Sequence, residues 1–139
     1  MEDRLKNFKT SFVVKKATFI NKMKSGNFKF SPDISISFNK TGDVEWETSI
    51  GVRALDRENN PFPFDIEVVV SLLTQLPNTL PEEFVLENYL KVSSVNILFP
   101  YVRSILASLS SALMVNPLHL PIVDVVAMTK DIEIPGLRG

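Results

Sequence analysis

The chain has 139 residues, a length that suits one domain with one hydrophobic core. Its net charge of −1 gives no basic excess for binding nucleic acid, and its 45% apolar content excludes a disordered chain. The absence of cysteine excludes disulfides and thiolate metal sites and fits a reducing compartment. The N-terminal residues lack a signal-peptide apolar stretch, and no apolar run approaches the roughly 18 residues of a membrane span. We expect a cytoplasmic protein without membrane insertion.

The first half of the chain predicts β-strands, because apolar and polar residues alternate along it. The expected strands cover residues 11–20, 33–39, 43–54 and 61–73. Turn-forming residues at 39–43 and 56–61 separate the last three of these strands. This arrangement predicts an antiparallel sheet with one covered face and one solvated face.

The alternation also fixes the parity of strand pairing. Apolar residues stand at even positions in both 43–54 and 61–73, so the two numbers in each cross-strand pair must add to an even number. A slip of one residue would place Ile50 among the acidic residues. The solvated face then carries Glu45, Glu47, Asp65 and Glu67. We expect Arg53 to lie near Asp65 on this face.

The second half of the chain predicts helices. Pro81, followed by two acidic residues, begins a helix expected over 81–92. Pro100 lies inside the next apolar stretch, and a proline costs about 3 kcal/mol in a helix interior. We therefore expect a kink there, with Asn96 capping a second segment over 97–114.

The second segment carries more apolar residues than one sheet contact buries, since such a contact covers a stripe of about 100°. The surplus predicts a further partner, most often another copy of the chain. Two prolines in 116–125 predict an extended apolar loop, followed by a short helix at 123–128.

Residues suited to catalysis are scarce. His119 is the only histidine, which without cysteine disfavours a zinc site and leaves a packed or surface histidine as the default interpretation. Asp65 and Glu67 form a carboxylate pair, but strand alternation puts them on the solvated face, where nothing raises a pKa for acid–base work. They remain candidates for an acidic surface that docks a partner. No glycine-rich phosphate loop is present. We expect no enzymatic activity, no metal and no cofactor.

The stretch NILFPYVRSILASLSSALMVNPLHLPIVDV, residues 96–125, resembles the protein-export chaperone family SecB. The resemblance rests on the block at 96–101, on Arg103 and on the loop residues 118–123, and the order of strands and helices extends it over nearly the whole chain. It implies an α+β fold in which a four-stranded antiparallel sheet is packed by a long kinked helix and a short C-terminal helix. The whole of 1–139 is expected to form one such domain. Residues 1–10 and 129–139 are expected to be flexible ends.

The resemblance also implies which residues carry the function. Matching positions give a groove for clients lined by Ile34, Ile36, Phe38, Leu118, Leu120, Val123 and Val125. The loop prolines are expected to keep its leucines exposed. The expected oligomer interface comprises Ile66, Val68, Val70, Leu98, Tyr101, Val102, Ile105 and Leu109. The first three match fourth-strand positions that influence tetramer assembly.

The resemblance implies an ATP-independent molecular chaperone, a holdase that binds unfolded or non-native polypeptides as a homotetramer. Its clients would be preproteins for export or a dedicated client such as an antitoxin, and a SecA-type translocase motor would be a further partner. Asn21 and Ser25 replace acidic residues of the face that docks the motor in this family. We therefore expect this chain to share the family's holding of clients more than its delivery of clients to the motor. A small-molecule or lipid carrier, or an adaptor protein using the same apolar surface, is the alternative.

Overall fold

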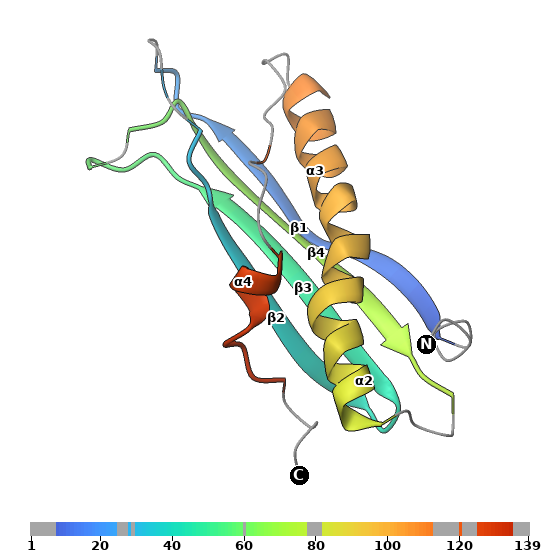
Figure 1. Ribbon diagram of the computed structural model, residues 1–139. Helices are drawn as coiled ribbons and strands as arrows, with labels where there is room; N and C mark the ends of the chain where they lie inside the picture. The colour runs from blue at the N-terminus through green and yellow to red at the C-terminus, as the bar shows by residue number, and fades with distance from the viewer. Residues whose placement is uncertain are drawn as a thin grey trace.

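One long helix crosses a four-stranded antiparallel sheet, and a short helix lies beside it (Figure 1). The structure is a computed structural model that describes residues 8–24, 28, 30–59, 61–77, 82–112, 120 and 125–134. The layers and the antiparallel sheet confirm the α+β fold expected from the sequence.

The four expected strands are all present, with ends shifted by a few residues. They are β1 (Lys9–Asn21), β2 (Asp33–Gly42), β3 (Glu45–Ala54) and β4 (Phe64–Gln75). Their order in the sheet is β1-β4-β3-β2, so β1 and β2 are the edge strands.

The pairing of β3 with β4 confirms the predicted parity, because every pair, from Glu45 with Gln75 to Ala54 with Ile66, adds to an even number. The expected partner of Arg53 was Asp65, but Arg53 lies directly opposite Glu67. Glu67 is two residues further along β4 and on the same face as Asp65. The hydrophobic pattern fixes which face a residue occupies. It does not fix the register within that face, because the connection between these strands is longer than a tight two-residue turn.

The helix-facing side of β3 and β4 forms the centre of the core. Its fully buried or nearly fully buried side chains are Trp46, Thr48, Ile50, Val52, Ile66, Val68, Val70, Leu72 and Thr74. The helix contributes Leu90, Val95, Leu98, Val102 and Leu106 to the same core.

The long helix is continuous. It consists of α2 (Glu83–Asn88), a π-helical turn η1 (Tyr89–Ser94) and α3 (Val95–Ala112), which contains Pro100. The expectation that Asn96 caps a separate segment is wrong, because the chain is already helical at Val95. The irregularity is a π-helical turn before Pro100. Pro100 has no amide hydrogen to donate to the carbonyl of Asn96, four residues earlier. Asn96 is exposed, so water can bond to that carbonyl instead.

A buried hydrogen bond joins the π-helical turn to the sheet. The hydroxyls of Thr48 on β3 and Ser94 lie 2.8 Å apart, and both residues are fully buried. The Ser94 hydroxyl also donates to the carbonyl of Leu90. Because a buried hydroxyl without a partner is costly, this contact fixes where the helix rests along β3.

By length and composition alone, the helical run Glu83–Ala112 is long and apolar enough to cross a membrane. In this fold Leu98, Val102 and Leu106 are fully buried. These residues stand four apart, which is the spacing of one helix face. This is the pattern of a core helix packed on a sheet.

The expected short helix is present as α4 (Val125–Thr129), which packs against η1. Lys91 of η1 donates to the carbonyl of Lys130 at 3.2 Å, just beyond the end of α4. Of the ends expected to be flexible, residues 9 and 10 are paired within β1 and Ile134 is buried. Residues 1–7 and 135–139 lie outside the described residues.

Candidate binding surfaces

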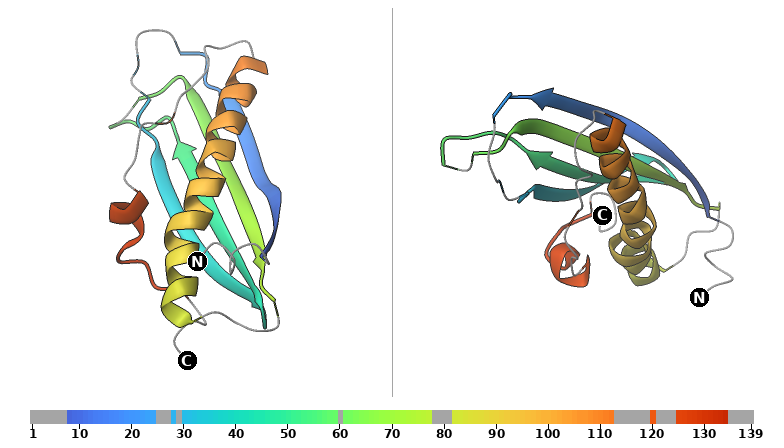
Figure 2. Two further views of the ribbon diagram at one scale, coloured as in Figure 1. Left: turned by 45° about the vertical axis from the view of Figure 1, so that its right-hand side comes forward. Right: turned by 90° about the horizontal axis from the view of Figure 1, so that it is seen from above.

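The long helix leaves apolar surface on both sides of it, because α3 packs on the two central strands β3 and β4 (Figure 2). We call the surface on one side the β1 strip, formed by Phe12, Val14, Ile97, Tyr101 and Ile105. We call the surface on the other side the β2 strip, formed by Ile34, Ile36 and Phe38.

The β1 strip is the more exposed of the two. Val14 is 52% exposed, Tyr101 48% and Ile97 40%. The rings of Phe12 and Tyr101 pack with their centroids 4.0 Å apart, which joins the helix to the edge strand. Exposed aromatic and aliphatic side chains clustered in this way mark an interaction surface.

The expected oligomer-interface residues divide into two groups in this structure. Tyr101 is exposed, and Ile105 and Leu109 are partly buried at the edge of the core. The others, Ile66, Val68, Val70, Leu98 and Val102, are buried by their own chain. Any effect of this second group on assembly must therefore pass through core packing. Sequence reasoning did not assign Phe12 or Val14 to the interface, although their alternation along β1 was available as a signal.

The β2 strip lies near the short helix. Ile34 and Ile36 are partly exposed and Phe38 is 5% exposed, while Val125 at the start of α4 is partly buried against the same core. Leu120 is only 6% exposed, so the expectation that the loop leaves this leucine exposed is wrong in this conformation, where it packs into the core. The remaining expected groove residues, Leu118 and Val123, lie outside the described residues.

A groove that sequence reasoning missed lies between the long helix and α4. Its volume is about 630 Å³, and its apolar walls are Phe84, Val92 and Val126. Phe84 and Val126 are 65% and 59% exposed. Its other lining residues are polar or charged: Glu87, Asn88, Lys91, Thr129 and Lys130.

The outer face of the sheet, away from the helix, carries paired charges. Lys15 forms an ion pair with Glu47 on β3, and Lys16 forms one with Glu67 on β4 at 2.7 Å. Consecutive strand residues normally point to opposite faces. A bulge between Val14 and Lys16 interrupts the alternation, so both lysines reach carboxylates of the outer face.

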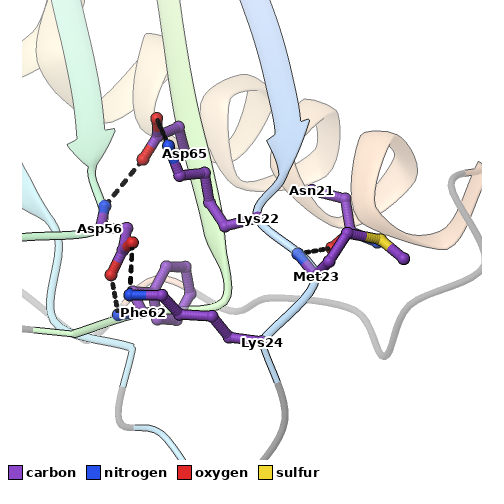
Figure 3. Close-up of polar contacts among 7 residues, drawn as sticks. All are labelled: Asn21, Lys22, Met23, Lys24, Asp56, Phe62 and Asp65. Carbon is purple, nitrogen blue, oxygen red and sulfur yellow. Dashed lines mark hydrogen bonds and ion pairs between the residues drawn. The ribbon is translucent and has the colours of Figure 1, made fainter.

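The same pairing continues at the end of the sheet (Figure 3). Lys24 pairs with Asp56 at 2.6 Å, and Lys22 lies 3.7 Å from Asp65. The backbone amide of Phe62 donates to Asp56, whose own amide donates to Asp65 at 2.7 Å. Both residues expected to form an acidic docking face, Asp65 and Glu67, therefore already have a lysine partner.

The pKa values of two of these carboxyl groups are lowered. The hydrogen bond from Lys24 holds the pKa of Asp56 below its ordinary value of 3.8, and that from Lys16 holds the pKa of Glu67 below 4.5. A carboxylate with a lowered pKa stays ionised near neutral pH and is a poor proton donor. Within the described parts of the chain, no group of three or more potential ligands could hold a metal ion.

Comparison with known proteins places the whole sheet and both helices in one family. Residues 9–132 match the family described as preprotein translocase subunit SecB. No curated protein sequence matches the chain.

Two solved structures share the fold at low identity. A SecB-like chaperone of Mycobacterium tuberculosis, solved in complex with a peptide from an antitoxin, superposes with a TM-score of 0.66 at 14% identity, covering 88% of this chain and 92% of its own. A Streptococcus agalactiae protein of unknown function superposes with a TM-score of 0.56 at 11% identity, covering 83% of this chain and 97% of its own.

Acid is expected to loosen β1 and its neighbouring loops. Because the pKa values of Asp56 and Glu67 are lowered in the folded state, their stabilisation is present above the ordinary values of 3.8 and 4.5 and is lost as the pH falls through the folded values. Urea unfolding measured between about pH 6 and about pH 3 should show Lys16→Gln with Lys24→Gln less stable than wild type at the upper pH. The two proteins should converge at the lower pH. A difference that stays constant would contradict the ion-pair account.

Proposed function

This chain belongs to the SecB family, and we propose that it acts in the cytoplasm as an ATP-independent holdase that binds non-native polypeptide segments. The observation that carries the proposal is the family match over residues 9–132 together with the partly exposed β2 strip beside α4. The holdase would catalyse no reaction. It would cover apolar segments of a client until that client folds or passes to another protein.

The β2 strip is suited to unfolded chains because of its shape and chemistry. It is an apolar face on an edge strand, with Ile34 and Ile36 still partly exposed. Burial of apolar surface contributes about 25 cal/mol per Å² and is non-directional, so one strip accepts many sequences. The groove between the long helix and α4, with Phe84 and Val126 exposed, offers a second apolar contact to a client.

The β1 strip supports assembly with a second copy of the chain. Phe12, Ile97 and Tyr101 present exposed apolar surface across a strand and a helix, a shape suited to a self-complementary contact. We assign this strip to the oligomer, a dimer or a homotetramer, and the β2 strip to the client.

The outer face supports holding a client more strongly than docking on a translocase motor. Asp65 and Glu67 are both paired with lysines, so this face presents little uncompensated negative charge to a basic partner. The M. tuberculosis chaperone with a similar fold was solved with an antitoxin peptide. A dedicated client such as an antitoxin is therefore favoured over general preprotein delivery.

The first test is light scattering of a chemically unfolded protein diluted into this chain without nucleotide. Wild type should suppress aggregation, because the β2 strip covers apolar segments of the client. Ile36→Asp should weaken the suppression by placing a charge among apolar contacts. Ser37→Asp, on the opposite face of the same strand, serves as the control and should suppress as wild type does. Absence of suppression by wild type at every ratio and with every client would refute the holdase.

The second test concerns the β1 strip. Ile97→Asp should lower the mass measured by analytical ultracentrifugation, since an unpaired charge in a buried interface is costly. The isolated fold should tolerate the change, because Ile97 is 40% exposed in the single chain. Asn96→Asp, at an exposed position on the other side of the same helix, is the matched control. An unchanged mass for Ile97→Asp would remove the β1 strip from the interface.

A further inference from the structure

A lysine stands at the end of the β2 strip, on the same face of the sheet. Lys40 follows Phe38 by two residues in β2, and side chains two residues apart in a strand point to the same face. The pairing with β3 agrees, because Phe38 lies opposite Thr48 and Lys40 lies opposite Trp46. Both of these partners are buried on the helix-facing side of β3. Lys40 therefore continues the row of side chains that forms the β2 strip.

The ring of Trp46 holds the ammonium group of Lys40 on this face. The Nζ atom lies 5.2 Å from the centroid of the ring, within the range of a cation–π contact. Trp46 is buried, whereas Lys40 is exposed. An ammonium group has three donors, and the ring covers only one side of the group. The contact thus places a positive charge at the end of the strip and leaves donors for a further partner.

No carboxylate in the described part of the chain pairs with Lys40. The lysines of the outer face differ in this respect, since Lys15 and Lys16 each pair with a glutamate. Glu45 is close to Lys40 in the sequence, but it precedes Trp46 in β3 and so points to the outer face. Its carboxylate accepts a hydrogen bond from Thr41 at 2.7 Å. The charge of Lys40 is therefore not compensated within the fold.

The spacing along β2 determines which client residue would meet Lys40. The strip from Ile34 to Phe38 extends about 13 Å at the rise of a β-strand, and Lys40 stands about 7 Å further along. An extended client that places every second side chain on the strip brings its next side chain on that face to Lys40. An acidic side chain at this position has the complementary charge.

We propose that Lys40 binds the carboxylate of an acidic client residue placed two positions beyond the apolar residues that occupy the β2 strip. The inference rests on the proposed function and narrows its client class to segments of alternating apolar residues with aspartate or glutamate at one end. The contact with Trp46 favours this pairing, because an ammonium group already held in place loses less side-chain freedom on binding.

The test uses fluorescent nine-residue peptides with leucine at the third, fifth and seventh positions and uncharged polar residues elsewhere. Glutamate stands at the first or the last position, so that both directions of binding are covered, and each glutamate peptide is compared with its glutamine counterpart. Anisotropy at low salt should show wild type binding one glutamate peptide about threefold more tightly than its counterpart, the scale of an exposed ion pair.

Three variants locate the charge that gives this preference. Lys40→Met should remove it and still bind the leucines, because methionine keeps an apolar contact with the indole ring. Lys40→Glu should reverse it, so that a peptide with lysine at the same end binds more tightly than the glutamine peptide. Structural damage would not produce that gain. Lys9→Met removes the same charge from the other edge strand, β1, and as the matched control should keep the wild-type preference.

The outcomes separate this inference from the proposed function. If glutamate and glutamine peptides bind wild type equally, or if Lys40→Met keeps the preference, the pairing is refuted while the holdase stands. The pairing is also refuted if Lys40→Glu does not favour the lysine peptide, or if Lys9→Met abolishes the preference as Lys40→Met does. If no peptide binds to wild type at all, the proposed function fails and this inference falls with it.

Discussion

One helix can cover only about two strands of a sheet, and the exposed surfaces of this protein follow from that limit. A helix with its side chains is about 10 Å wide, and strands lie about 4.8 Å apart. The sheet has four strands, and α3 packs on the two central ones. The helix-facing residues of both edge strands are therefore left for other elements or other molecules to cover.

The two edges differ in what lies beside them. On the β1 side the helix itself adds Ile97 and Tyr101, which produces a broad surface suited to a second copy. On the β2 side Leu120 and Val125 pack into the same core, and Ile34 and Ile36 stay partly exposed. A narrow apolar strip of this kind suits an extended segment rather than a folded partner. The buried hydroxyl pair of Thr48 and Ser94 fixes the helix between these two surfaces.

The charges of the outer face pair largely with one another. The bulge in β1 lets both Lys15 and Lys16 pair with carboxylates of β3 and β4, and Lys24 continues the pairing at the end of the sheet. The face is therefore stabilised by internal ion pairs, and its carboxylates are poor candidates for binding a basic partner.

Much of the fold could be predicted from the sequence, because apolar residues repeat every second position along a strand and this repeat is visible without knowledge of tertiary contacts. It placed Ile50, Val68 and Val70 on one face and predicted the even parity of the β3–β4 pairing, which the structure confirms. It did not locate the pair of Arg53 with Glu67, since parity leaves register steps of two residues open.

Features that depend on tertiary contact could not be predicted in this way. The π-helical turn at Tyr89–Ser94 is stabilised by a hydroxyl on a distant strand, and the burial of Leu120 depends on packing against the core. Lys15 and Lys16 both pair with carboxylates on one face because a bulge interrupts β1, and the alternation of residues does not predict that bulge. A small pocket at the end of the sheet is lined by Arg53 of β3 and Arg57 of the following loop, which only the fold brings together.

Hydrogen exchange with mass spectrometry, with and without a bound unfolded client, tests the central claim most directly. The account predicts that the client protects amides of β2 over residues 33–38, while β1 exchanges as it does in the protein without client. Protection confined to β1, with β2 unchanged, would contradict the assignment of the two strips.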